Sequence, residues 1–159
     1  MTELKPVDQW SEAAYNRSFD TNVRGPFFLI QALLPDLSNP ASIVLNASIN
    51  AHIGMPNSSV YDATKAALLS LARTLSGELI GRGIRVNAVS NGPIATPLYS
   101  KLGLSAVDLK STSEALQSQI PAKRFGKPGE IASAVVFLAS DESAFTVGSE
   151  LIADGDLGL

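Results

Sequence analysis

The stretch Ile43–Lys65, I-V-L-N-A-S-I-N-A-H-I-G-M-P-N-S-S-V-Y-D-A-T-K, organises the rest of this chain. It begins as a short apolar strand, becomes polar at Asn46 and Ser48, and crosses a loop of Gly, Pro, Asn and Ser. It then enters a helix in which Tyr61 and Lys65 are four residues apart, so that both side chains lie on one face. Ser48 stands thirteen residues before Tyr61, where the strand ends. The pattern predicts a hydroxyl, a phenol and an ammonium at one place.

A phenol beside an ammonium is a candidate for proton transfer. Free tyrosine has a pKa near ~10, and a cation one helical turn away favours the phenolate, so we expect Lys65 to lower the pKa of Tyr61. Tyr61 would then exchange a proton with an alcohol or carbonyl oxygen, while Ser48 donates a hydrogen bond to the same oxygen. For this pair taken alone, a solvated phenol beside a surface lysine is the alternative.

Outward from this stretch, helices alternate with short apolar strands. Helical periodicity extends from Gln9 to about Leu37, with Asp8 as the N-cap and an interruption at Gly25-Pro26. Further helices are expected at 59–82 and 128–140, strands at 43–45, 84–89 and 149–153, and less regular structure at 97–120. This order predicts an α/β fold, a parallel sheet with helices on both faces, in a single domain over 1–159.

Composition excludes several classes of function. The 159 residues are 45% apolar and 17% charged, with a net charge of −3 and no cluster of Lys and Arg, which argues against nucleic-acid binding. There is no cysteine and a single histidine, His52, so no metal site is expected. No signal peptide and no apolar stretch long enough to cross a membrane is found, and a cytoplasmic location is the default expectation.

Several ordered motifs resemble the short-chain dehydrogenase/reductase family. They are D-T-N-V-R-G-P-F-F at 20–28, N-A-S at 46–48 with its spacing to Y-D-A-T-K-A-A-L at 61–68, V-N-A-V-S-N-G-P-I-A-T-P-L at 86–98, R-F-G-K-P-G-E-I-A at 124–132 and G-S-E-L-I-A-D-G at 148–155. The resemblance covers essentially the whole chain.

The resemblance implies a role for each matching residue. Tyr61 would be the general acid/base, Lys65 would lower its pKa and bind the nicotinamide ribose, and Ser48 would orient the substrate oxygen. Asn22 would hold a water that connects Lys65 to solvent. Contacts to the nicotinamide end of NAD or NADP would come from the segment containing Gly92, Pro93, Ile94 and Thr96. The implied reaction interconverts a small-molecule carbonyl and a secondary alcohol, in a dimer or tetramer.

The chain also departs from the family pattern. No Gly-rich T-G-x-x-x-G-x-G turn is present, so we expect a partial Rossmann-like doubly wound sheet that lacks the first strands, roughly 90–100 residues at about 30 per β-α unit. The strand at 43–45 should then have an open edge that favours self-association. Asn91 and Asp156 replace a proline and a glycine of the family pattern. The alternative function is a catalytically dead, dehydrogenase-like module that acts in oligomerisation.

Other residues near the expected site have weaker support. His52 would border the substrate mouth or be an ordinary loop histidine. An apolar substrate pocket and plain loop packing are equally supported for Ile49, Met55, Leu98, Tyr99 and Leu102.

Overall fold

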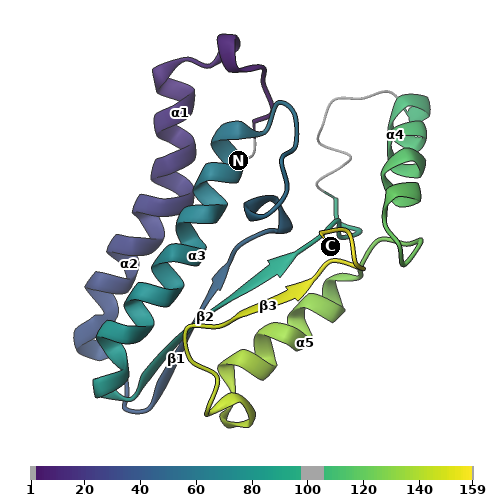
Figure 1. The fold of residues 1–159 in the computed structure, drawn as a ribbon. Coiled ribbons are helices and arrows are strands. Elements are labelled where there is room, and N and C mark those ends of the chain that lie inside the picture. The colour runs from purple at the N-terminus through teal and green to yellow at the C-terminus, as the bar shows by residue number, and fades with distance from the viewer. Residues whose placement is uncertain (1–2, 98–105, 159) are drawn as a thin grey trace.

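Three parallel strands form the centre of the molecule, in the order β1-β2-β3 (Figure 1). The structure is a computed structural model that describes residues 3–97 and 106–158. β1 (Ala41–Asn46) pairs along its whole length with β2 (Ile84–Asn91), and the end of β2 pairs with β3 (Glu150–Ala153). The expected parallel α/β architecture is confirmed.

β2 is buried on both faces because helices cover the sheet from two sides. Ile84, Val86 and Ala88 lie in a core with α3 (Ser59–Leu79), whose Leu68, Leu75 and Leu79 point into it. On the opposite face the Arg85 guanidinium donates to main-chain oxygens of Leu138, Ser140 and Thr146. These contacts tie α5 (Pro128–Ala139) and the turn before β3 to the middle strand. A central strand buried on both faces is typical of a parallel sheet, and on the α5 side the buried polar groups of Arg85 and Asn87 are hydrogen-bonded.

The N-terminal helix differs from expectation in its start and in its interruption. Val7–Gln9 is a 3-10 turn, and α1 (Glu12–Phe19) has Ser11 as its N-cap, whose Oγ accepts from the Ala14 amide at 3.3 Å. The prediction of Asp8 as N-cap is therefore wrong. The interruption near Gly25-Pro26 is a π-helical segment, Asp20–Arg24, which leads into α2 (Gly25–Leu33).

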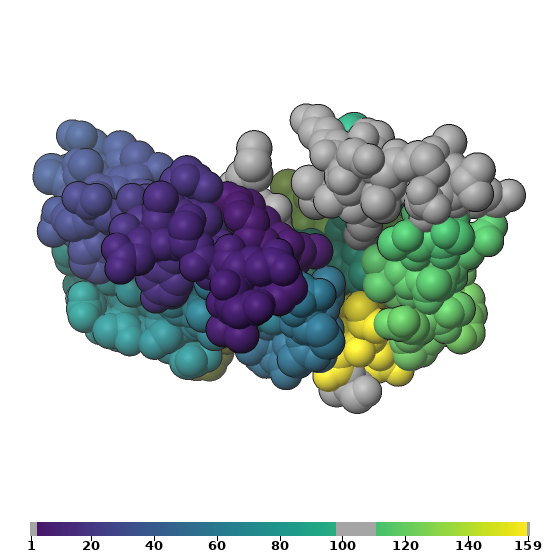
Figure 2. Space-filling model, turned by 90° about the horizontal axis from the view of Figure 1, so that it is seen from above, coloured from purple at the N-terminus to yellow at the C-terminus, as the bar shows by residue number. Residues whose placement is uncertain are grey.

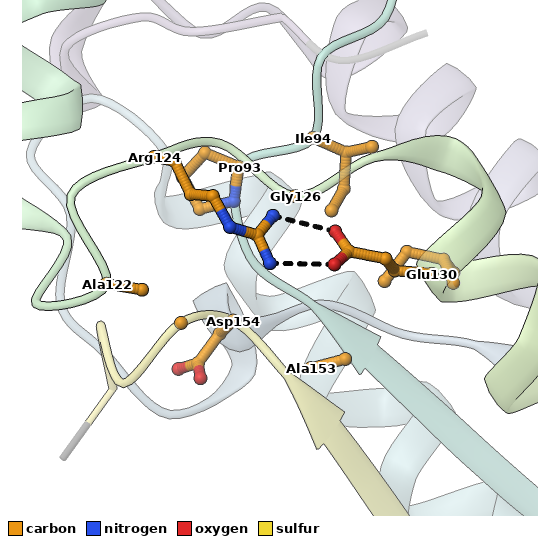
Figure 3. A pocket seen from close by; sticks show the side chains of 10 residues that line it. Pro93, Ile94, Ala122, Arg124, Gly126, Glu130, Ala153 and Asp154 are labelled. Carbon is orange, nitrogen blue, oxygen red and sulfur yellow. Dashed lines mark hydrogen bonds and ion pairs between the residues drawn. The ribbon is translucent and has the colours of Figure 1, made fainter.

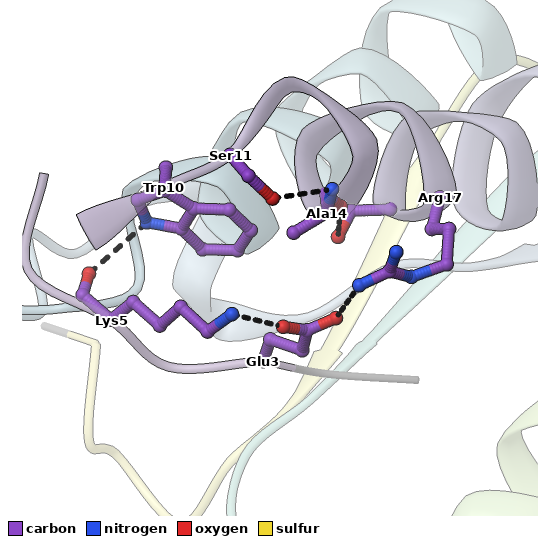
Figure 4. A network of polar contacts seen from close by, with 7 residues as sticks. Glu3, Lys5, Trp10, Ser11, Ala14 and Arg17 are labelled. Atoms are coloured by element: carbon purple, nitrogen blue, oxygen red, sulfur yellow. Dashed lines mark hydrogen bonds and ion pairs between the residues drawn. The ribbon is translucent and has the colours of Figure 1, made fainter.

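The first residues are anchored to α1 by a polar network (Figure 4). The Glu3 carboxylate lies 2.6 Å from Lys5 Nζ and 2.9 Å from an Arg17 guanidinium nitrogen, and these bonds lower the pKa of Glu3. The Trp10 indole donates to the Lys5 carbonyl at 3.1 Å, and the Lys5 amide donates to the Asn57 carbonyl at 2.7 Å. The network holds the N-terminal segment beside the loop that precedes α3.

A further helix stands near the carboxyl ends of the strands (Figure 1). α4 (Ala106–Gln119) lies in the part of the sequence for which less regular structure was expected, so that expectation is wrong. Viewed from above, the N-terminal segment, in purple, and the green part of the chain after residue 110 lie on opposite sides of the molecule (Figure 2). The short 3-10 turns at Leu34–Asp36, Ile49–Ala51, Ile80–Arg82 and Asp141–Ser143 complete the described elements.

Candidate active site

The polar residues at the end of β1 meet the first turn of α3. Ser48 follows the strand directly and is 5% exposed, and its Oγ accepts a hydrogen bond from the Asn50 amide at 3.2 Å. Main-chain pairing continues past the strand, because the Ala47 amide donates to the Val89 carbonyl at 2.8 Å. Ser48 is thereby fixed at the carboxyl edge of the sheet, where ligands bind in open α/β folds.

Tyr61 lies half-buried against Ser48. Burial raises the pKa of the Tyr61 phenol, a hydrogen bond with Ser48 lowers it, and the negative charge of Asp62 raises it again. The net direction is upward, opposite to the lowering expected from Lys65. The Lys65 Nζ lies 5.6 Å from the centre of the Tyr61 ring, over its face. Burial is the largest of these effects, and it favours the protonated phenol.

Lys65 points toward the edge of the sheet rather than to the phenol oxygen. Its Nζ donates to the Asn46 carbonyl at 2.8 Å, and burial lowers the pKa of this ammonium. Asn22 lies nearby on the π-helical segment, where its amide donates to Thr64 Oγ1 at 3.0 Å. Thr64 in turn donates to the Tyr61 carbonyl at 2.7 Å. Asn22 is thus attached to the turn of α3 that carries Tyr61 and Lys65.

A groove of about 830 Å³ runs along β1 beneath α2. Asn22 and Lys65 line it together with apolar side chains of both elements, among them Leu29, Ile43 and Leu45. The groove therefore joins two of the expected site residues to the outer edge of the sheet.

The segment after β2 forms a second part of the site. The Gly92 amide donates to the Ala153 carbonyl at 3.1 Å, and a Cβ on Gly92 would lie 2.7 Å from the Asp154 Cα, so only glycine fits. Ile94 forms a parallel bridge with Gly126, and Thr96 is exposed.

Pro93 and Ile94 line a cavity of about 180 Å³ that α5 closes (Figure 3). There the Arg124 guanidinium makes two bonds to the Glu130 carboxylate, at 2.7 and 2.8 Å, and these bonds with that of the Lys127 amide lower the pKa of Glu130 to about 2. The structure thus brings Ser48, Tyr61 and Lys65 together, whereas Pro93 and Ile94 line a separate cavity.

Comparison with known proteins identifies the family of the chain. A family model described as enoyl-(acyl carrier protein) reductase matches residues 2–157. A solved structure titled as a short-chain dehydrogenase/reductase, glucose/ribitol dehydrogenase from Brucella melitensis, superposes with a TM-score of 0.90 at 38% identity, over 99% of this chain and 61% of that one. The chain belongs to the short-chain dehydrogenase/reductase family.

The chain is similar to relatives in this family that are named for different substrates. The chain is 37% identical over 148 residues to 2-keto-3-deoxy-L-fuconate dehydrogenase of Xanthomonas campestris pv. campestris, covering 91% of this chain and 49% of that protein. It is 38% identical over 148 residues to the 3-oxoacyl-(acyl-carrier-protein) reductase of Thermotoga maritima, covering 92% and 58%. This short-chain dehydrogenase/reductase chain therefore spans about half the length of these curated relatives.

The weaker candidates of the sequence are placed as follows. His52 is exposed, and its Nε2 lies 2.7 Å from Glu150 Oε1, at the start of β3. Ile49 is 3% exposed and packs in the interior, whereas Met55 is exposed and its sulfur accepts from the Asn50 amide. Leu98, Tyr99 and Leu102 lie outside the described residues. In the described part of the chain no cluster of three or more His, Cys, Asp or Glu could hold a metal ion.

Sequence reasoning missed two residues of the site, Asp62 and Asn50. Asp62 accepts from the Asn50 side-chain amide at 2.9 Å and from the Ser58 hydroxyl. Asn50 lies beside Ser48, and Ser58 directly precedes α3. The one available signal was a carboxylate directly after the phenol in Y-D-A-T-K, because that charge acts on Tyr61 at short range.

No helix described for this short-chain dehydrogenase/reductase chain is long and apolar enough to span a membrane. The cytoplasmic location expected from the sequence stays a prediction.

Proposed function

We propose that this chain supplies the proton-transfer site of an NAD(P)-dependent oxidoreductase that interconverts a carbonyl and a secondary alcohol. The observation that supports it most directly is the meeting of Ser48, Tyr61 and Lys65 at the carboxyl edge of the sheet. Relatives named as dehydrogenases and as a 3-oxoacyl-(acyl-carrier-protein) reductase support the same reaction class.

The residues present fit the nicotinamide-ribose end of such a cofactor. Lys65 gives one of its three N–H donors to Asn46 among the described residues, which leaves donors for ribose hydroxyls. A Cβ on Gly92 would clash with Asp154, so glycine there lets the segment after β2 pack directly against the residue that follows β3. The bound nicotinamide would supply or accept the hydride, and the protein would position the substrate and move the proton.

Proton transfer is assigned to Tyr61. In the reducing direction its phenol, kept protonated by burial, donates to the oxygen that develops negative charge, while Ser48 donates a hydrogen bond to that oxygen. In the oxidising direction the phenolate accepts the alcohol proton, and Lys65 stabilises it from beside the ring. Asn22, linked to Thr64, keeps the π-helical segment against this turn.

Cofactor titration and turnover of the 159-residue chain test the proposal. We expect micromolar binding of NADH or NADPH, measured by fluorescence. We also expect oxidation of NADH or NADPH that depends on a 3-oxoacyl thioester, or reduction of NAD+ or NADP+ that depends on an aldose or a deoxy-keto sugar acid. Tyr61→Phe should lower turnover by about 10²–10⁴-fold with little change in cofactor affinity, because it removes only the transferred proton. Tyr15→Phe, at an exposed tyrosine of α1, is the matched control.

The second candidate function is a module without catalysis that acts in association. The open edge of β1 favours it, because the described residues pair β1 on one side alone. Absence of both cofactor binding and turnover in the unmodified chain would overturn the enzyme proposal and leave association as the function.

A further inference from the structure

A chain of hydrogen bonds connects the carboxylate of Asp62 to Ser48. Asp62 Oδ1 accepts from the Asn50 Nδ2 at 2.9 Å, and Asp62 Oδ2 accepts from the Ser58 hydroxyl, a residue with no exposed surface. Asn50 also donates its backbone amide to Ser48 Oγ at 3.2 Å. The carboxylate thus holds the loop residue that contacts Ser48.

The charge of Asp62 determines how the Asn50 amide is turned. An ionised carboxylate only accepts hydrogen bonds, so it binds the NH₂ end of Asn50 and turns the carbonyl end, Oδ1, toward Ser48. That Oδ1 lies 3.5 Å from Ser48 Oγ, longer than a normal hydroxyl bond. Ser48 Oγ meanwhile accepts the backbone amide. Its own proton is therefore left for the phenol of Tyr61 or for a substrate oxygen.

We propose that Asp62 and Asn50 are positioning residues, which together orient the Ser48 hydroxyl as a donor. The inference rests on the proposed function for its catalytic meaning, but the orientation itself requires no cofactor. It assigns a role to two residues outside the Asn22, Ser48, Tyr61 and Lys65 set.

The electrostatic effects on Tyr61 agree with this assignment. The Ser48 bond lowers the pKa of Tyr61, whereas the adjacent Asp62 charge raises it. The Lys65 ammonium also lies over the Tyr61 ring. The elements packed against α3 include α1, the π-helical segment Asp20–Arg24 and the turn Ile49–Ala51. These elements and the residue after the turn carry the titratable side chains of Glu12, Tyr15, Arg17, Asp20, Arg24 and His52. Arg24 is paired with Asp20, and His52 with Glu150.

Two substitutions should move the titration of Tyr61 in opposite directions. Asp62→Asn removes the neighbouring charge and keeps the side-chain shape, so the Tyr61 midpoint should fall. Asn50→Ala keeps the charge of Asp62 but frees Ser48, so the bond that favours the phenolate weakens and the midpoint should rise. The titration is followed by NMR of ring-labelled tyrosine, with Tyr61→Phe to assign the signal.

The matched control is Glu78→Gln, which removes one exposed carboxylate from the same helix, sixteen residues and about 24 Å along its axis from Asp62. It should leave the Tyr61 midpoint unchanged. The inference is overturned if Asp62→Asn matches the control, or if both site variants shift the midpoint in the same direction. Opposed shifts in a chain that neither binds NAD(P)H nor turns over would uphold the network while the proposed function fails.

Discussion

At the scale of single residues, Tyr61 shows how far sequence reasoning reaches. The identity and spacing of Ser48, Tyr61 and Lys65 were predicted from the sequence, and the structure brings these three together. The predicted lowering of the Tyr61 pKa was wrong. The direction depends on the burial of the phenol and on where the Lys65 ammonium points, and an i, i+4 spacing determines neither. Asn50 and Asp62 were missed because their bond joins a loop to a helix without any periodic signal.

Asp156 is a residue whose backbone is strained. Its φ is +75°, in the left-handed region, and its amide donates to Asp154 Oδ1 at 3.0 Å. A side chain there costs about 1–2 kcal/mol, whereas glycine loses about 0.5–1 kcal/mol of chain entropy. We expect Asp156→Gly to raise the free energy of unfolding by roughly 0.5 kcal/mol, measured by urea denaturation.

The control for this prediction is Asp141→Gly, at the start of a 3-10 turn and outside the set of residues with positive φ. It should destabilise the chain by about 0.5–1 kcal/mol. Equal losses in the two variants would show that the Asp156 backbone is not strained.

At the scale of elements, strong periodicity decided what was predictable. β2, α3, α5 and β3 were located to within a few residues because each has a clear apolar pattern and a Gly or Pro boundary. α4 was missed because A-V-D-L-K-S-T-S-E-A-L-Q-S-Q mixes serine and charge with few apolar positions. The N-cap moved from Asp8 to Ser11 because Val7–Gln9 is occupied by a separate turn.

The start of α5 makes a pH-dependent contribution to stability. Bonds from Arg124 and from the Lys127 amide lower the pKa of Glu130 to about 2 in the folded chain, below the unfolded value of about 4.3. A carboxylate with a lowered pKa stabilises the fold above the unfolded pKa and loses this effect as the pH falls toward the folded value. We expect the free energy of unfolding to fall between about pH 4.3 and 2 through this group.

Glu130→Gln should flatten that part of the curve, measured by denaturant titration at a series of pH values. Glu78→Gln removes an exposed carboxylate for which no ion pair is described, and it should retain the slope of the unmodified chain. An unchanged slope in Glu130→Gln would mean that other carboxylates cause the acid sensitivity.

At the scale of the whole molecule, the outer edge of β1 is one of the two edges at which the described sheet is unpaired. The amides of Ala41 and Ala47 donate to carbonyls of Gly83 and Val89 on the β2 side, so those of Ser42 and Val44 face the opposite edge. Leu29 and Leu33 of α2 are 60% and 45% exposed beside that edge. Unpaired edges with apolar neighbours favour association.

We expect the chain to form dimers in which two β1 edges pair about a twofold axis, because antiparallel strand edges are self-complementary. Light scattering should give a mass above that of the monomer and dependent on concentration. Val44→Pro removes an outward amide and should yield a folded monomer, since proline is tolerated at strand edges. Ile43→Pro removes an amide that faces β2 and should instead unfold the chain. A monodisperse monomer of the unmodified chain would contradict the expectation.

The Lys65–Asn46 bond connects this open edge to the candidate active site. Asn46 lies two residues beyond Val44, so its carbonyl also points outward, and the Lys65 ammonium takes the place that a neighbouring strand would fill. A strand that added there would compete for the carbonyl and release the ammonium for other acceptors. Assembly and ligand capture are then thermodynamically linked, and by reciprocity a ligand that engages Lys65 should increase the dimer fraction.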